Sequence, residues 1–441
     1  MTDATLSAGN APARPWWRPE PEAAPLATKE REGLAFGALL TFLFVLLIAP
    51  QNQLAALASL RPALIAAVLA VTTCLGGRFL DRRPLSVSAP GLGLGIALGA
   101  WAILTIPLSY WPGGSVTVLL DLYLKTLALF WLLANLVDTK ERLRRMTLAL
   151  TAMGVPLAVT GVRHYASGAF LDDSGVKRIE GYSSGLAANP NDLALVLNLL
   201  LPLALGLALG RQALKGRVFA FLAAAVLAMG VVVTFSRAGF VTLLTTVLVY
   251  LFKLLRRGHV APAAAVLFIA FLALPLLPQG YVARVASIAS LDSDPTRSAQ
   301  NRWSDIRAAL RILPERPLLG VGLGMNILAL NDERGTTWTA VHNVYLQLGV
   351  ELGLPGLALF GALLVTSVRA ARRAQRGASA AGDPELHHLA EGIEVALLAF
   401  AVSALFYPVA YHFYFYLIAG LAAAAGAMSL PPPAVPGELR A

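Results

Sequence analysis

Apolar and polar residues alternate along this chain in long blocks. Apolar stretches of about 20 residues are separated by short polar segments, and a helix of about 20 apolar residues crosses a hydrocarbon core about 30 Å thick. The pattern therefore predicts an all-α polytopic membrane protein with about twelve transmembrane helices. Eleven or thirteen remain alternatives, because the last two blocks could form one broken hairpin. The expected spans cover residues 33–49, 54–76, 91–108, 115–137, 146–165, 190–209, 217–235, 237–254, 260–277, 342–368, 391–410 and 412–430.

Three segments lie outside these blocks and define the domain organisation. Residues 1–32 are polar and rich in proline and lack the early apolar core of a cleavable signal peptide, so we expect a disordered tail there. Residues 431–441 form a second tail. Residues 278–341 are too long and polar for a turn, and loops of this length usually carry function or are disordered. The expected order is a tail, nine spans over 33–277, a loop domain over 278–341, and three spans over 342–430.

The loop domain has helical periodicity of its own. An amphipathic helix is predicted over 301–313, because apolar residues recur there at helical spacing: Trp303, Ile306, Leu310 and Leu313. Arg302, Arg307 and Arg311 lie off this stripe, and Pro314 and Pro317 should end the helix. The following Gly320, Gly322 and Gly324 favour a tight turn over a phosphate cradle, since no strand of a nucleotide-binding unit precedes them.

The basic residues orient the spans. The chain is 57% hydrophobic and only 14% charged, and its formal net charge is +10. Such a charge in a soluble protein would suggest a nucleic-acid partner, but here the basic residues stand in short runs between apolar blocks, so no nucleic acid is expected. With the N-terminus inside, 22 of the 35 Lys and Arg residues face the cytoplasm. Every short inner loop is then basic, which predicts cytoplasmic termini and an outer loop domain.

Most isolated reactive residues favour a structural interpretation. The single cysteine, Cys74, excludes a disulfide within the chain and a cysteine metal cage. Asp172 and Asp173 should be solvated, and no histidines have zinc-ligand spacing; no metal and no cofactor are therefore expected. Asp121 and Lys125 are intramembrane charges that could pair at i, i+4. An outer aromatic belt is predicted from Tyr407, Tyr411, Phe413, Tyr414, Phe415 and Tyr416.

His342 is the strongest candidate for chemistry. Counting back from the inner anchor Arg369 at 1.5 Å per residue places it about 10 Å above the hydrocarbon, at headgroup height. If His342 is helical, it shares a face with Gly349 and Gly353, whereas Glu351 lies on the opposite side. The glycines could provide close helix packing or open space in front of the histidine. The histidine itself could be a structural hydrogen-bonding group or a catalyst.

The segment around His342 also resembles a known signature. His342-Asn343, nine residues, Gly353, two residues and Gly356 are similar to the motif of the O-antigen ligase family. Its superfamily includes O-antigen polymerases and protein O-oligosaccharyltransferases. The resemblance extends over about 170–356 through three further segments: Asn189-Pro190-Asn191, Ser236-Arg237-Ala238-Gly239 and 301–324. Asn189, Pro190, Asn191, Asn343, Gly353 and Gly356 are the motif or structural positions.

The resemblance implies an inverting, metal-independent glycosyltransferase of the bacterial inner membrane with a periplasmic active site. Its donor would be an undecaprenyl-diphosphate-linked glycan, and its acceptor would be lipid A–core or a growing glycan. Membrane lipids would surround the protein. His342 would be the general base, because an imidazole with an ordinary pKa exchanges protons near neutral pH. Arginine suits the donor phosphates through its planar fork. The candidates are Arg178, Arg237, Arg302 and Arg307.

Two alternatives remain at this point. A polymerase of the same superfamily differs only in its acceptor. A polysaccharide transporter or flippase would require a path of intramembrane charges and internal repeats, and only Asp121 and Lys125 suggest such a path. The residues by themselves identify neither the glycan nor the acceptor.

Overall fold

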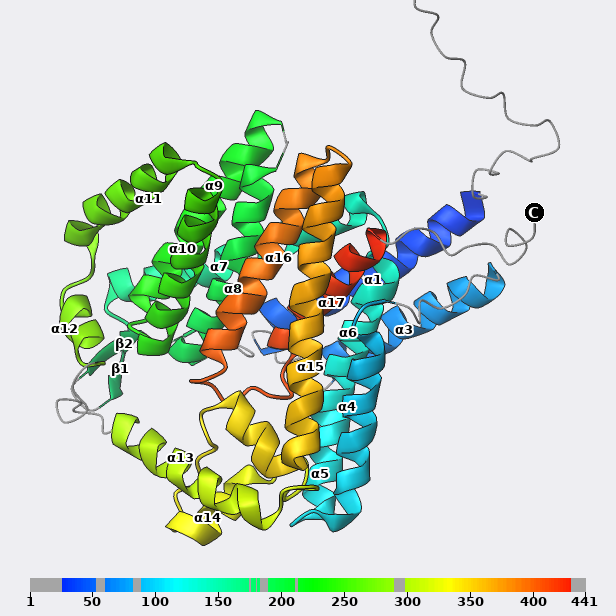
Figure 1. The fold of residues 1–441 in the computed structure, drawn as a ribbon, viewed down its shortest axis with the longest axis vertical. Helices are drawn as coiled ribbons and strands as arrows, with labels where there is room; N and C mark the ends of the chain where they lie inside the picture. The colour runs from blue at the N-terminus through cyan, green and yellow to red at the C-terminus, as the bar shows by residue number, and fades with distance from the viewer. Residues whose placement is uncertain are drawn as a thin grey trace, which may run out of the picture.

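The computed structural model describes residues 26–52, 60–81, 89–173, 176–179, 181–182, 189–210, 213–288 and 298–429, and these form a bundle of helices (Figure 1). The helices before the hairpin are α1 (Leu26–Ile48), α3 (Pro62–Leu80), α4 (Leu92–Thr105), α5 (Pro112–Val118), α6 (Leu124–Leu136) and α7 (Lys140–Ser167). The hairpin consists of β1 (Phe170–Asp173) and β2 (Val176–Ile179). After it come α8 (Pro190–Leu209), α9 (Leu214–Val233), α10 (Arg237–Arg256), α11 (Val260–Ala273), α12 (Tyr281–Ala286), α13 (Ser298–Glu315), α14 (Asn326–Arg334), α15 (Val344–Ala380), α16 (Pro384–Ser403) and α17 (Phe413–Met428).

The helical membrane class predicted from the sequence is confirmed. Within the described ranges, nine helices are long and apolar enough to cross a membrane, and three shorter apolar helices (Leu92–Leu108, α11 and α17) lie where the remaining spans were expected. The number of crossings stays a prediction. One departure from an all-α fold is the antiparallel hairpin, in which Phe170 pairs with Ile179.

Helix boundaries differ from the expected spans at several ends. α1 begins at Leu26, before the expected start at 33, and α15 continues to Ala380, well past 368. The polar end of α15 stays helical because alanines such as Ala371, Ala374 and Ala378 form a buried stripe there. Residues 1–25 and 430–441, which make up most of the two expected tails, lie outside the described residues.

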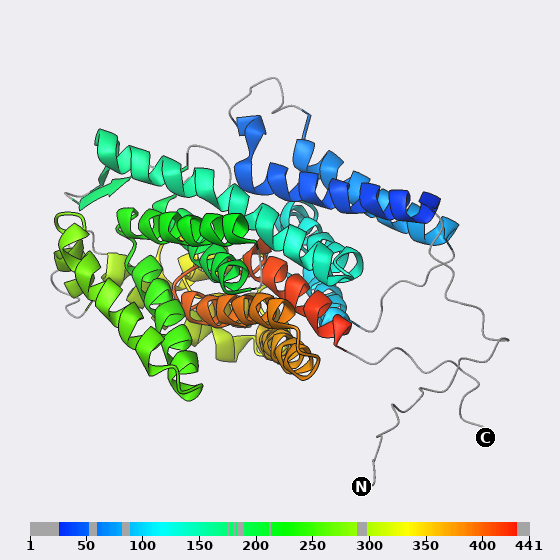
Figure 2. The same ribbon diagram turned by 90° about the horizontal axis from the view of Figure 1, so that it is seen from above.

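The helices pack around a buried centre. α8 and α17 are buried along almost their whole length, and α15 and α16 pack beside them. α1 and α3 lie side by side at one edge of the bundle (Figure 2). The loop domain, with α13 and α14, covers the end of the bundle at which α15 begins (Figure 1).

Helix α15 is kinked at the family-like glycine motif. Gly353 has φ 67° and ψ −174°, which interrupts the helix, and Pro355 lacks the N–H that would bond the carbonyl of Glu351. The carbonyls freed by the kink accept hydrogen bonds from elsewhere: Val350 from the Val321 amide at 2.8 Å, Glu351 from Gly322 at 2.9 Å, and Leu352 from the Trp101 indole at 2.8 Å. The kink gives Gly353 a backbone role, and the glycine also allows close packing, because a Cβ there would clash with the carbonyl oxygen of Leu318.

The glycine-rich segment after α13 is a tight turn, as predicted, and it packs against this kink. Gly320, Gly322 and Gly324 have φ values of 66°, 101° and 77°, in the left-handed region that glycine adopts without strain. A Cβ on Gly322 would clash with the Cβ of Ser109. The turn therefore serves close backbone approach and donates its amides to α15 rather than to a phosphate.

The predicted amphipathic helix of the loop domain is α13, but it packs on the protein through another face. Its buried residues are Asp305, Ala308, Ala309 and Ile312. Trp303 and Leu310 on the predicted apolar stripe are 51% and 53% exposed. Pro314 lies in the last turn rather than ending the helix, which stops at Glu315 before Pro317. The helix thus has a small-residue face toward the protein and a larger apolar face directed outward.

Candidate functional site

His342 precedes helix α15 rather than lying within it. Asn343 is the N-cap: its φ is −160° and its side-chain oxygen accepts from the amides of Tyr345 and Leu346 at 3.0 and 3.1 Å. An N-cap asparagine satisfies amides that have no partner in the first turn. The prediction that His342 shares a helical face with Gly349 and Gly353 is therefore wrong, because α15 begins after His342.

The backbone before His342 is fixed by a buried polar network. The side-chain oxygen of Asn326 accepts from the amide of Val341 at 3.0 Å. Asn326 in turn donates its amide and its side-chain nitrogen to the fully buried carboxylate of Glu351. As expected from the sequence, Glu351 is not a partner of His342. It anchors the loop that carries the histidine.

A second contact holds this loop from α13. Arg334 pairs with the buried Asp305, Nε to Oδ1 at 3.0 Å, and donates to the carbonyl of Thr339 at 2.8 Å. The Nδ1 atom of His342 lies 3.9 Å from Oδ2 of Asp305, beyond hydrogen-bond distance. Asp305 thus faces the imidazole without bonding it directly.

The environment of His342 favours the neutral imidazole. Burial, and then the positive charge of Arg302, lower the pKa of His342 to about 4. Its side chain keeps 32% exposure, and Nδ1 has no hydrogen-bond partner among the described residues. The ordinary pKa expected from the sequence is therefore wrong, because burial and, to a lesser extent, the charge of Arg302 lower the pKa of His342. A neutral imidazole can accept a proton.

Four arginines from four elements line one cavity. They are Arg178 of β2, Arg237 of α10, Arg284 of α12 and Arg302 of α13. Three of them were expected at the site. The cavity measures about 20 Å³, room for one water molecule, so a diphosphate would enter only if the side chains spread apart. Arg307 does not line the cavity; its guanidinium carbon lies 5.2 Å from the ring centre of the exposed Trp303.

Asn191 joins the elements around this cavity. Its side-chain oxygen accepts from Nη2 of Arg178 at 2.9 Å and from the hydroxyl of Ser236 at 2.8 Å. The hydroxyl of Tyr407 donates to its carbonyl at 3.1 Å. The predicted start of α8 is confirmed, with Asn189 as N-cap and Pro190 as the first residue. The motifs that contain Asn191 and Ser236 therefore meet in space, although they lie 45 residues apart in sequence.

Arg237 stands at an unusual place for a cation. It is the first residue of α10, capped by Ser236, whose hydroxyl accepts from the Gly239 amide at 3.1 Å, and the first turn contains no acidic residue. A helix N-terminus carries partial positive charge and attracts anions, and Arg237 adds a full positive charge at the same place. The turn before it is tight, with Phe235 at φ 52°. Arg237 and the helix end therefore both favour an anion.

The sequence gives weak or no signal for several residues of this region. Arg284 stands alone in the short helix α12 and belongs to no motif. Asp305 could have been found from the second, alanine-rich face of α13, where it is spaced with Ala308, Ala309 and Ile312. Burial raises the pKa of Asp305, and the nearby Arg334 and Arg302 oppose that change.

The predicted aromatic belt is wrong. Tyr407, Tyr411, Phe413, Tyr414, Phe415 and Tyr416 are all at most 4% exposed. They pack inside the bundle, where the hydroxyls of Tyr123 and Tyr416 lie 3.1 Å apart. A belt requires exposure at the membrane interface, whereas the loop between α16 and α17 folds inward over α15 and α8.

The other polar candidates lie in several separate elements. Cys74 is a buried free cysteine, as expected. Asp172 and Asp173 lie in β1. Asp121 lies in a π-helical turn, Leu119–Tyr123, and shares a cavity with Lys125, Gln51 and Phe413, but Asp121 and Lys125 form no ion pair with each other.

One group within the described residues brings three possible metal ligands close together: His387, His388 and Glu391. Its donor atoms are already engaged. Glu391 pairs with Arg257 and Lys253, and the Arg257 guanidinium also lies 3.2 Å from Nε2 of His387. A bound metal ion would have to displace a guanidinium of the same sign of charge, so this group does not fit a metal site.

Comparison with known proteins supports the interpretation of these motifs. Residues 220–361 match the O-antigen ligase family, which confirms the resemblance over that part of the chain. The match includes Arg237, Arg302, His342, Gly353 and Gly356 but not Arg178 or the segment at Asn189. No curated protein matches the chain.

Proposed function

With residues 220–361 similar to O-antigen ligases, we propose that this protein is an inverting, metal-independent glycosyltransferase. Its donor would be a glycan linked to undecaprenyl diphosphate, and its acceptor a sugar of lipid A–core. The observation that carries the proposal is that a neutral histidine and a cavity lined by four arginines occur in one region of the protein. Arg302 connects the two, since it lines the cavity and its charge acts on His342.

The proposed reaction is a direct displacement at the anomeric carbon. The acceptor hydroxyl oxygen forms the new bond to that carbon while His342 takes the hydroxyl proton. The bond between the anomeric carbon and the phosphate oxygen breaks, and undecaprenyl diphosphate leaves with the electron pair. Arg178, Arg237, Arg284 and Arg302 stabilise the charge on the departing diphosphate.

The chain should be oriented with both termini and the basic ends of α7 and α15 in the cytoplasm. Reporter fusions at Arg145 and Arg373 are expected to read cytoplasmic, and fusions at Asp173 and Arg297 periplasmic. The physical reason is the excess of basic residues in the short inner loops. A cytoplasmic signal from the loop domain would contradict both this orientation and the mechanism.

Transfer by the purified protein should not depend on a metal. In detergent or lipid nanodiscs, glycan transfer from undecaprenyl diphosphate to lipid A–core is expected to continue in excess chelator. Among the described residues, one set of possible metal ligands lies close together: His387, His388 and Glu391. Glu391 of this set already pairs with Arg257 and Lys253. Loss of transfer that Mg²⁺ or Mn²⁺ restores would contradict the proposal.

The same assay separates the ligase from a polymerase. A ligase extends lipid A–core, whereas a polymerase joins one lipid-linked glycan to another and leaves lipid A–core unmodified. Absence of both products from active membranes, together with movement of the lipid-linked glycan across the bilayer, would favour the transporter alternative instead.

A further inference from the structure

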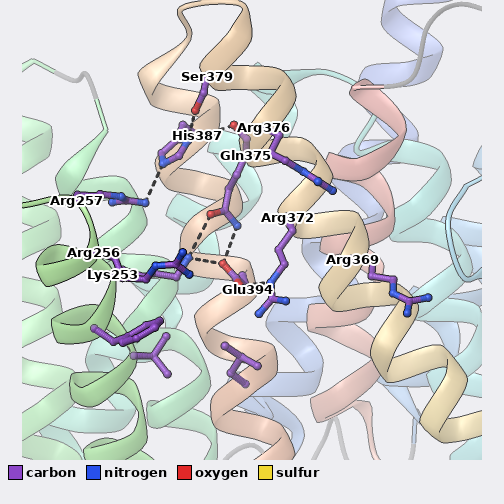
Figure 3. A pocket seen from close by; sticks show the side chains of 13 residues that line it. Lys253, Arg256, Arg257, Arg369, Arg372, Gln375, Arg376, Ser379, His387 and Glu394 are labelled. Carbon is purple, nitrogen blue, oxygen red and sulfur yellow. Dashed lines mark hydrogen bonds and ion pairs between the residues drawn. The ribbon is translucent and has the colours of Figure 1, made fainter.

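A second, larger cavity lies at the opposite end of the bundle from His342. It measures about 840 Å³ and lies between the ends of α10 and α15 and the start of α16 (Figure 3). Its basic residues are Lys253, Arg256, Arg257, Arg369, Arg372 and Arg376. His342 precedes the first residue of α15, whereas Arg369 lies 25 residues into that helix, so His342 and this cavity are separated by roughly the thickness of a membrane.

Buried carboxylates account for only part of this positive charge. Glu391 and Glu394 are 1% and 3% exposed. Lys253 pairs with both, Arg257 with Glu391, and Nε of Arg372 with Oε1 of Glu394 at 2.6 Å. Gln375 adds a side-chain hydrogen bond to Glu394 at 2.9 Å. These contacts hold the three helices together and satisfy the two acidic groups.

Three cations of the cavity have no acidic partner in the part of the chain that the structure describes. Arg256, Arg369 and Arg376 are exposed and form no ion pair with the described residues. Arg256 stacks on Phe252, with its guanidinium carbon 5.6 Å from the ring centre. Arg369, Arg372 and Arg376 follow one another at i, i+3 and i+7, so they share a face of α15. Figure 3 shows them along that helix, on the side opposite the cations of α10.

Apolar residues line the membrane side of the same cavity. Val249 precedes Lys253 by one helical turn, Leu398 follows Glu394 by one turn, and Phe252 is 60% exposed. Leu248 and Leu255 on α10 are also more than half exposed. The cavity thus has a cationic part at the end of the spans and an apolar part that continues onto lipid-facing helix surface.

We propose that this cavity binds the headgroup of an anionic phospholipid. Arginines contact phosphate oxygens through paired N–H groups, and basic pockets between helix ends commonly hold acidic lipid headgroups. A phosphodiester fits the uncompensated charge of Arg256, Arg369 and Arg376, and acyl chains fit the adjoining apolar surface. A soluble phosphate would use the cations but not Val249, Phe252 and Leu398. The proposal requires only that the chain crosses a membrane and is independent of glycan transfer.

The test measures lipid binding by the full-length protein in detergent, by native mass spectrometry with cardiolipin, phosphatidylglycerol or phosphatidylcholine. The double variant R369Q/R376Q should bind the two anionic lipids about 30-fold less tightly, because each cation near an anionic headgroup contributes about fivefold. Arg256→Gln on the other helix should weaken binding about fivefold. The matched control K215Q/R373Q removes two exposed cations that do not line the cavity and should bind like the wild type.

Several outcomes would overturn the proposal. Equal affinity of the cavity variant and the control for anionic lipids would show that the cavity is not the site. Equal affinity of the wild type for phosphatidylcholine would show that charge is not recognised. Tight competition by inorganic phosphate or glycerol phosphate would indicate a soluble ligand. Failure of glycan transfer in the wild type would affect only the proposed function, since lipid binding is measured without a glycan donor.

Discussion

Replacing His342 by alanine is expected to reduce glycan transfer by about 10²–10⁴-fold, the usual contribution of a general base, while the lipid-linked donor still binds. The reason is that His342 would act on the acceptor hydroxyl, whereas the arginines of the cavity would hold the diphosphate in the ground state. The measurement is the transfer rate beside donor affinity, with folding checked by thermal unfolding. His259→Ala removes an exposed histidine outside the site and should leave transfer unchanged.

The pH dependence of kcat/KM provides an independent check on the same residue. Because the pKa of His342 is lowered to about 4, the imidazole is neutral and able to accept a proton at neutral pH. Transfer should therefore remain constant as the pH falls from 7 through 6 and should decline only near pH 4. A decline centred at pH 6.5 would contradict the lowered pKa of His342. Near-normal transfer by the His342→Ala variant would show that His342 has a structural role instead.

Arg237→Ala is expected to weaken both donor binding and turnover. Donor binding should fall about 10–100-fold, as for loss of a hydrogen bond to a charged group, and turnover by a further factor of about 10²–10³, because the same contact strengthens as the diphosphate leaves. Arg178→Ala should behave similarly, since both arginines line one cavity. Arg237→Lys should recover activity in part, because lysine retains the charge but loses the planar fork.

The matched control for the arginine series is Arg163→Ala. Arg163 is exposed near the end of α7, on the same side of the bundle as β2, and does not line the arginine cavity. Its removal should change neither donor affinity nor turnover. If Arg237→Ala bound the donor as tightly as the wild type, the assignment of the diphosphate to this cavity would be wrong, whatever happened to the rate.

Features that depend on neighbouring residues were predicted well from the sequence. The helix start at Asn189-Pro190 follows from a side chain that bonds an amide two residues away. The apolar blocks correspond to helices because hydrophobicity over about 20 residues is a local property. The glycine turn at 320–324 was also predicted, though its contact with the kinked α15 was not.

Errors arose where a pattern was assumed to continue or where partners are distant in sequence. Counting His342 into α15 failed because its neighbour Asn343 caps the helix. The aromatic residues near Tyr411 were taken for a surface belt, although the loop after α16 folds inward and buries them. Arg307 and Arg302 are five residues apart on one helix, and nothing in their spacing indicates that only Arg302 lines the cavity.

The sequence by itself determined the membrane class, the order of the helices and the cap at Asn189, because each depends on composition or on contacts within a few residues. The family resemblance, rather than any local property, indicated His342 as the candidate base. Only the tertiary structure decided which arginines meet, that Arg284 joins them, and that Arg302 and burial lower the pKa of His342. It alone also revealed the basic cavity at the far end of α10 and α15. Charges from separate elements combine through space, and their distances depend on how the helices pack rather than on their spacing along the chain.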